Sequence, residues 1–281
     1  PALLALAGPE AAEKVAEADT GSDASGDEPL PLDALRSIDT RAKLSIDKAR
    51  FDVHEITAVK ARVRAVEGSI KLLSLTGDLH GGKIDMKANF NAKHNTAKLS
   101  TQGGLNGMNI ATALAAMESD PLMSGGAGVN WKLQSAGTPA NELIEALKGP
   151  INIDTQDAVL QGTSVEHMLC KAVALANQQA LSANFPESSS FEQLSMKLDL
   201  KDGKLRLTPL TARLPGVSLK GQGRVMLLEQ NFSAKFAARL SPELGEVDPA
   251  CEINERYTSL DWPVICEGDL GGDPGDWCTV D

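Results

Sequence analysis

Cysteine and histidine are the residue types in this 281-residue chain that could ligate a metal ion or form covalent cross-links. The cysteines lie in the second half of the chain, at Cys170, Cys251, Cys266 and Cys278. The histidines are scattered, at His54, His80, His94 and His167. Because no two cysteines have the Cys-x-x-Cys spacing of a zinc site, we expect no metal ligands. Three cysteines crowd into the tail, which favours disulfide bonds formed in an oxidising compartment.

The pairing of the cysteines stays open, because four cysteines permit three connectivities. A bridge between Cys251 and Cys266 would close a loop of about 15 residues and stabilise the fold by roughly 3 kcal/mol in the chain-entropy model. Cys170 and Cys278 would then be left to pair. Four reduced, buried thiols are the alternative.

The sequence offers little toward a catalytic cluster. Gly162-Thr163-Ser164 is not the Gly-x-Ser-x-Gly turn of a hydrolase, and no phosphate-binding glycine loop is present. Asp78 and Asp85 fall on the polar side of alternating segments, where solvated charge is the usual explanation. His167 lies beside a helix start and is expected at a surface or a helix contact. We therefore expect a protein that is not an enzyme and that needs no cofactor.

Charge argues against a nucleic-acid partner. The formal net charge of −11 would repel a phosphate backbone at long range. No stripe of Lys and Arg interleaved with aromatic residues offsets this repulsion, and aromatic residues make up only 4% of the chain.

The start of the chain resembles a linker that follows a missing segment. No stretch approaches the roughly 20 apolar residues that span a bilayer, and the run from Ala2 to Ala7 is too short for a signal peptide. Because the sequence opens without Met, we expect any membrane anchor or export signal to lie outside this chain. Residues 1–34 are acidic, of low complexity and without aromatics, which predicts a disordered linker.

From Ala42 onward the hydrophobic period becomes two, which predicts strands. Residues 84–90 and 232–236 alternate strictly between apolar and polar types. Gly81-Gly82 and Lys201-Asp202-Gly203 suit the tight turns of an antiparallel meander. We expect a β-rich domain over residues 35–240 and a cysteine-containing cap over 241–281.

Three helices interrupt this pattern, near 109–119, 139–148 and 164–180. The first has apolar residues at helical spacing. Thr138-Pro139 is expected to supply an N-cap and a first-turn proline for the second helix. Thr163-Ser164-Val165-Glu166 has the capping-box pattern that opens the third.

The domain contains an internal duplication. A shift of 135 positions aligns residues 61–88 with 196–223, so that Glu67-Gly68 falls on Asp202-Gly203 and Gly81 on Gly216. Each copy is predicted to form strand, turn, strand, turn, strand. A repeated meander indicates an extended antiparallel sheet that grows by adding units, each with one apolar face to cover.

That apolar face is the candidate binding surface for lipid. Gly221 and Gly223 lie within it, and glycine inside a strand often marks a close approach to the backbone. Either a helix packs on the face or it lines a groove for an apolar ligand. The candidate residues are Ile84, Met86, Phe90, Met196, Leu198, Leu205, Leu207, Val217, Leu219, Val225, Leu227, Phe232 and Phe236.

Several segments resemble the C-terminal periplasmic region of the AsmA family. They are the duplicated units, residues 162–170 (GTSVEHMLC), 215–221 (PGVSLKG) and above all the tail 248–257 (DPACEINERY), followed by Asp261-Trp262-Pro263 and Cys266. The resemblance covers roughly residues 35 to 281.

The resemblance implies a mainly β fold with a few helices, in which a curved sheet forms a groove closed by the disulfide-stapled end. It implies a periplasmic protein anchored in the bacterial inner membrane, with a role in outer-membrane biogenesis. Binding or transfer of phospholipid along the groove is the expected function. A non-lipid scaffold that contacts outer-membrane assembly proteins, or a purely structural cap, is the alternative.

Overall fold

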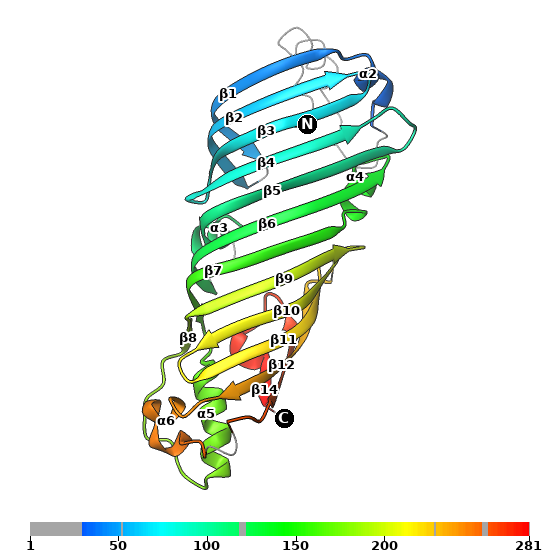
Figure 1. Ribbon diagram of the computed structural model, residues 1–281. Coiled ribbons are helices and arrows are strands. Elements are labelled where there is room, and N and C mark those ends of the chain that lie inside the picture. The colour runs from blue at the N-terminus through cyan, green and yellow to red at the C-terminus, as the bar shows by residue number, and fades with distance from the viewer. Residues whose placement is uncertain (1–29, 52, 118–121, 228, 255–257, 281) are drawn as a thin grey trace. The chain divides into compact units, whose positions relative to one another are not determined.

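The computed structural model describes residues 30–51, 53–117, 122–227, 229–254 and 258–280. These residues form a mainly β fold with a sheet of fourteen strands and five short α-helices. The strands follow one another in chain order from β1 to β14, except that β8 pairs with β7 beside this path (Figure 1). Their registers are antiparallel. The predicted antiparallel β fold is confirmed, while the expected disorder of the linker concerns residues that lie mostly outside the described ranges.

The strands are β1 Thr40–Phe51, β2 His54–Val66, β3 Ser69–Leu79, β4 Gly82–Asn91, β5 Ala97–Asn109, β6 Met123–Gly137, β7 Gly149–Gln161, β8 Ser188–Phe191, β9 Gln193–Lys201, β10 Lys204–Leu214, β11 Val217–Met226, β12 Asn231–Leu240, β13 Trp262–Asp269 and β14 Cys278–Val280. The α-helices are α2 Leu32–Arg36, α3 Ile110–Ala116, α4 Ala140–Glu145, α5 Val165–Ala176 and α6 Leu244–Val247. Two single-turn 3-10 helices, η2 Pro249–Cys251 and η4 Pro274–Asp276, lie in the tail.

The chain divides into two compact units. Unit 1 comprises residues 1–106 and 130–150, and unit 2 comprises residues 107–129 and 151–281. Unit 1 therefore holds β1 to β4, unit 2 holds β8 to β14 and most of β7, and β5 and β6 contribute residues to both.

The two predicted repeat copies form matching meanders, β2-β3-β4 in unit 1 and β9-β10-β11 in unit 2. In each meander a two-residue turn joins the first strand to the second, and both of its φ angles are positive. They are 45° and 74° at Glu67-Gly68 and 51° and 68° at Asp202-Gly203. Such turns match the twist of the strands they join and favour glycine. Each copy also has an irregular register, between Leu72 and Leu75 in β3 and between Leu207 and Leu210 in β10. These positions share the offset of the repeat, which supports the duplication.

The helices begin where capping residues satisfy their first N–H groups. Asn109 Oδ1 accepts from the Thr112 N–H at α3, and Ser164 Oγ accepts from the His167 N–H at α5. The capping-box pattern of residues 163–166 predicted a helix start there, but Ser164 rather than Thr163 is the N-cap. The prediction for α4 was wrong in detail, because Pro139 rather than Thr138 is the N-cap and makes no side-chain cap. The Thr138 hydroxyl donates to the Asn95 carbonyl instead, at 3.0 Å, and so ties α4 to the β4-β5 connection.

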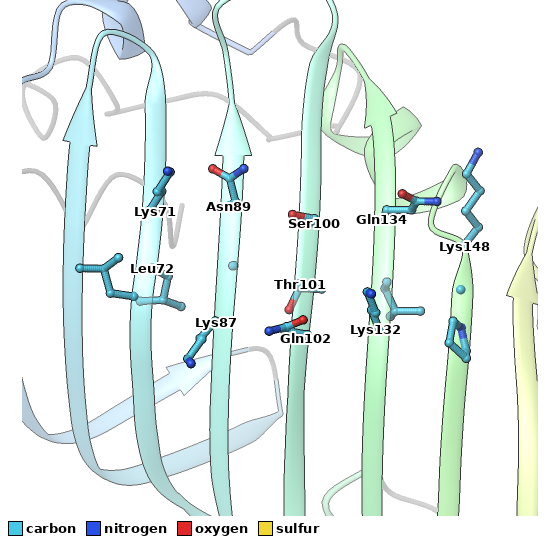
Figure 2. A pocket seen from close by; sticks show the side chains of 15 residues that line it. Lys71, Leu72, Lys87, Asn89, Ser100, Thr101, Gln102, Lys132, Gln134 and Lys148 are labelled. Carbon is cyan, nitrogen blue, oxygen red and sulfur yellow. The ribbon is translucent and has the colours of Figure 1, made fainter.

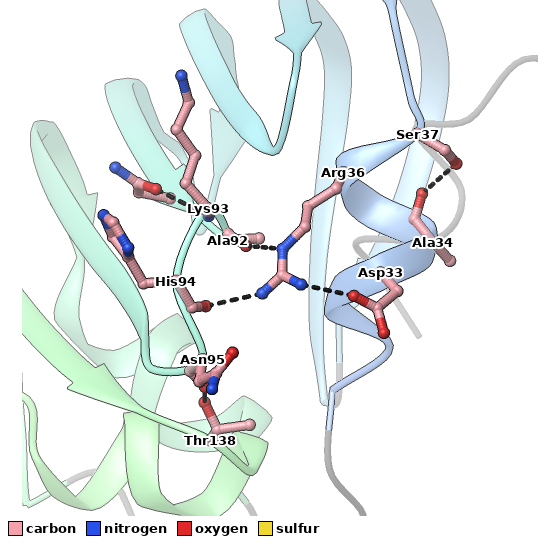
Figure 3. A network of polar contacts seen from close by, with 10 residues as sticks. Asp33, Ala34, Arg36, Ser37, Ala92, Lys93, His94, Asn95 and Thr138 are labelled. Atoms are coloured by element: carbon pink, nitrogen blue, oxygen red, sulfur yellow. Dashed lines mark hydrogen bonds and ion pairs between the residues drawn. The ribbon is translucent and has the colours of Figure 1, made fainter.

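The core of unit 1 lies at the end of its sheet that α2 and α4 cover. Leu32 and Leu143 from these helices pack against Phe90, Ala92 and Ala97. A polar network around Arg36 of α2 fixes this contact (Figure 3). Its guanidinium donates to the carbonyls of residues 92 and 94, at 2.7 and 3.0 Å, and pairs with Asp33.

The core of unit 2 is built by α5 and the tail against β7 to β13. Leu169, Cys170 and Val173 of α5 pack with Leu214 and Leu240 of the sheet, all at most 4% exposed. Asp248 holds the tail in place, because its carboxylate accepts N–H bonds from residues 182, 183 and 250 and the Ser182 hydroxyl.

All four cysteines form disulfides, as predicted, but the pairing is not Cys251 with Cys266 and Cys170 with Cys278. Cys170 pairs with Cys251 and Cys266 pairs with Cys278. The bridge considered between Cys251 and Cys266 was wrong, because β14 lies antiparallel to β13 and its register sets Cys278 directly opposite Cys266. Helix α5 meanwhile brings Cys170 within 5.1 Å of Cys251, measured between Cα atoms.

Across the described residues, no helix is both long and apolar enough to cross a membrane.

Candidate functional site

In unit 1, apolar side chains lie directly opposite one another across four strands. One row runs Ala42, Val63, Leu72 and Ala88, and the next runs Leu44, Ala61, Leu75 and Met86. Cross-strand neighbours on one face are close enough to contact each other. The first four strands therefore share one continuous apolar face.

The predicted residues of unit 1 occupy different parts of this face. Phe90 is 3% exposed and belongs to the core beneath α2 and α4. Ile84 is 8% exposed and Met86 is half-buried, and both lie outside that core cluster. Of the three residues predicted in unit 1, only Phe90 therefore belongs to the core cluster beneath α2 and α4.

Sequence reasoning missed the contribution of β1, β2 and β6 to this face. Val59, Ala61, Val63 and Ala65 of β2 are all buried, and the period-two pattern of residues 59–65 carried that signal. Trp131 of β6 lies over Gly103, beside Met86, and its indole N–H donates to the Thr101 hydroxyl at 3.2 Å.

In unit 2, the strand register brings the remaining candidates onto one face, Leu227 excepted. One row runs Leu200, Leu205, Val225 and Phe232, the next runs Leu198, Leu207, Gly223 and Ala234, and a third runs Met196, Leu210, Gly221 and Phe236. Leu227 follows the end of β11 and is 44% exposed.

Part of the unit 2 face is covered by the protein itself. Val217 and Leu219 belong to the core under α5. Phe232 packs edge-on against Trp277, with ring centroids 5.1 Å apart, and Phe236 lies over Gly221. The predicted close approach at Gly221 is thus made by an aromatic ring of the neighbouring strand. Besides Leu227, five candidates lie outside this core cluster: Met196, Leu198, Leu205, Leu207 and Val225.

Among the described residues, the titratable side chains that could act in catalysis occur singly or in pairs. His54 Nδ1 and His80 Nε2 are 2.9 Å apart, and burial, followed by the charge of His54, lowers the pKa of His80. Backbone N–H bonds, chiefly from Ala183 and Ala250, lower the pKa of Asp248 to about 2, which suits a structural carboxylate. His167 is exposed and stacks on Phe185 at 4.7 Å. Among the described residues, no group of three His, Cys, Asp or Glu side chains could hold a metal ion.

Comparison with known proteins identifies a related family. The model of the AsmA family matches residues 7–210. Protein AsmA of Escherichia coli K12 is 22% identical over 215 residues, which cover 76% of this chain and 35% of the relative. The chain thus spans about a third of the length of the curated relative that it matches. No solved structure matches.

Proposed function

Because the chain belongs to the AsmA family, we propose that it is part of an envelope protein that binds phospholipid acyl chains on the apolar faces of its sheet. The observation that carries this proposal is the set of apolar rows that lie outside both core clusters. In unit 1 these include Leu44, Ala61, Leu75 and Met86, and in unit 2 Leu198 and Leu205.

Apolar surface that lies outside the core clusters favours the binding of hydrocarbon. Apolar area gains roughly 25 cal/mol per Å² when it leaves water, so a row of half-buried aliphatic side chains attracts a hydrocarbon chain. Contiguous apolar patches on a soluble surface mark binding sites. Acyl chains fit such a row because they need no hydrogen-bond partner. We extend the proposal to a periplasmic location, an inner-membrane anchor outside this chain and a role in outer-membrane biogenesis.

Photocrosslinking to lipid tests this proposal directly. A benzophenone amino acid placed at Met86 or Leu198 should crosslink to radiolabelled phospholipid in vesicles. The matched controls are Asp85 and Lys197, which neighbour these residues in the chain but point to the opposite, polar face and do not line the hollow described below. Equal lipid crosslinking from both faces, or none from Met86 and Leu198, would refute acyl-chain binding.

A scaffold for protein partners is the second candidate, and the edge strand favours it. Strand β1 pairs only with β2 among the described strands and is 12 residues long. An edge strand presents backbone groups that can add a strand from another chain. Crosslinks from β1 to protein, without lipid crosslinks from Met86, would support this alternative.

A further inference from the structure

The polar face of unit 1 contains a hollow ringed by lysines. Its volume is about 870 Å³. Lys71 of β3, Lys87 of β4, Lys132 of β6 and Lys148, which precedes β7, line it together with neutral polar residues (Figure 2). The remaining lining residues are Gly149 and the apolar residues Leu72, Leu73, Ala88, Leu133 and Pro150. None of the lining residues is Asp or Glu. Because the chain as a whole is acidic, this concentration of positive charge is specific to the hollow and its surroundings.

No lysine of the hollow forms an ion pair with another described residue. Among the described residues, the ion pairs of unit 1 join Arg36 to Asp33, Lys48 to Glu55 and Lys83 to Asp78, and none involves a lysine of the hollow. Residues 40–109 carry twelve Lys and Arg against six Asp and Glu. This local excess of positive charge is not visible in the net charge of the whole chain, and the strand register places it on one face of the sheet.

The register also sets like charges directly opposite one another beside the hollow. Arg64 faces Lys71 across β2 and β3, and Arg41 faces Arg64 across β1 and β2. Like charges in directly opposite positions destabilise a sheet. A bound anion would offset this repulsion, whereas the folded protein alone gains nothing from it.

An unsatisfied amide lies in the same hollow. Asn89 is directly opposite Lys71 on β3 and Ser100 on β5. Its Oδ1 is buried and has no hydrogen-bond partner among the described residues. Buried polar atoms in folded proteins are normally paired. Since a half-turn of the amide exchanges oxygen and nitrogen, Asn89 can accept from a ligand hydroxyl or donate to an anionic oxygen.

We propose that this hollow binds a phosphate group, carried by a soluble phosphate ester or by a lipid headgroup. A phosphate has several oxygens and more than one charge, which suits lysines arranged around it as point charges. Gln102, directly opposite Lys87, and Ser100 add neutral hydrogen-bonding groups that can orient it. No aromatic side chain lines the hollow, so stacking of a nucleic-acid base has no platform there.

The test measures binding of two phosphate sources at low ionic strength, because salt screens exposed charges. Calorimetry with glycerol 3-phosphate reports the soluble source, and co-sedimentation with phosphatidylglycerol vesicles, against phosphatidylcholine vesicles, reports the headgroup. The double substitution K71Q/K132Q should weaken binding at least tenfold. The matched control K43Q/K60Q removes the same charge from the same unit outside the hollow and should weaken binding less than threefold.

A further variant separates loss of the site from loss of the fold. Asn89→Asp places an anion among the lysines, so it should abolish phosphate binding while keeping or raising the melting temperature. Binding of glycerol 3-phosphate supports a soluble ligand, and binding of anionic vesicles alone supports a headgroup. Absence of both, or equal weakening by K71Q/K132Q and K43Q/K60Q, overturns the proposal.

Discussion

The two disulfides should stabilise unit 2 unequally, because they close loops of different length. The cysteines are separated by 81 residues in the Cys170–Cys251 bridge and by 12 in the Cys266–Cys278 bridge. In the chain-entropy model, cross-links of this kind stabilise by about 4.5 and about 2.8 kcal/mol, respectively. Replacing Cys170 and Cys251 by alanine should therefore cost about 1.7 kcal/mol more than replacing the other pair.

The burial of the cysteines also makes replacement of Cys170 and Cys251 the more destabilising change. Cys170 and Cys251 are fully buried, whereas Cys278 is only half-buried, so the first pair of substitutions also leaves the larger packing defect. At about 2–4 °C per kcal/mol for a unit of this size, the difference corresponds to a melting temperature about 3–7 °C lower.

Tryptophan fluorescence during guanidinium unfolding measures this difference. The chain has three tryptophans, of which Trp262 and Trp277 lie in unit 2 and Trp131 in unit 1. In a W131F background the signal reports unit 2 alone. If C266A/C278A destabilises unit 2 as much as C170A/C251A, the loop-length reasoning is wrong.

Three further predictions concern single residues. Gly221→Ala should destabilise unit 2 by about 1–3 kcal/mol, because the added Cβ would overlap the Phe236 ring. Gly271→Ala is the control, since nothing lies within 4 Å of the Cβ added there, and it should leave the guanidinium midpoint unchanged. An unchanged midpoint for Gly221→Ala would contradict the prediction. Because the pKa of His80 is lowered in the folded state, His80 contributes to folding stability fully above about pH 6.5, and this contribution is lost as the pH falls through the folded pKa. His80→Asn should therefore flatten the fall in melting temperature between pH 7 and 5. An unaltered profile of melting temperature against pH would exclude this contribution. The pKa of Asp248, about 2, predicts that this carboxylate contributes fully to folding stability above about pH 4 and loses its contribution between about pH 4 and 2. Asp248→Asn should lower the melting temperature at pH 7 and remove the loss of stability between pH 4 and 2. A variant that still loses stability in this range would show that another group causes the loss.

Local patterns predicted much of the fold because they depend on neighbours in the chain. The alternation of residues 84–90 identified β4, and Glu67-Gly68 identified the turn before β3. Ser164 caps α5 because side-chain and backbone groups three residues apart meet in any helix start. The shared apolar face followed from period two alone, since strand side chains alternate between faces.

Contacts between distant segments could not be predicted in the same way. The pairing of Cys266 with Cys278 depends on the register of β14, and that of Cys170 with Cys251 on how α5 packs against η2. Which candidates are covered depends likewise on α2, α4, α5 and Trp277. The basic hollow could not be predicted, because its lysines are 16 to 77 residues apart in the chain and meet only through the register of the strands.

The two faces of unit 1 should bind their ligands independently. Met86 belongs to the apolar face and does not line the hollow, whereas Lys87 and Asn89 line it, because successive side chains of β4 point to opposite sides of the sheet. A lipid whose headgroup occupies the hollow keeps its acyl chains on the polar side, so one molecule cannot occupy both sites. Saturating glycerol 3-phosphate should therefore leave lipid crosslinking from position 86 unchanged, as should K71Q/K132Q. Displacement of the crosslinked lipid by glycerol 3-phosphate would show that the two faces do not act separately.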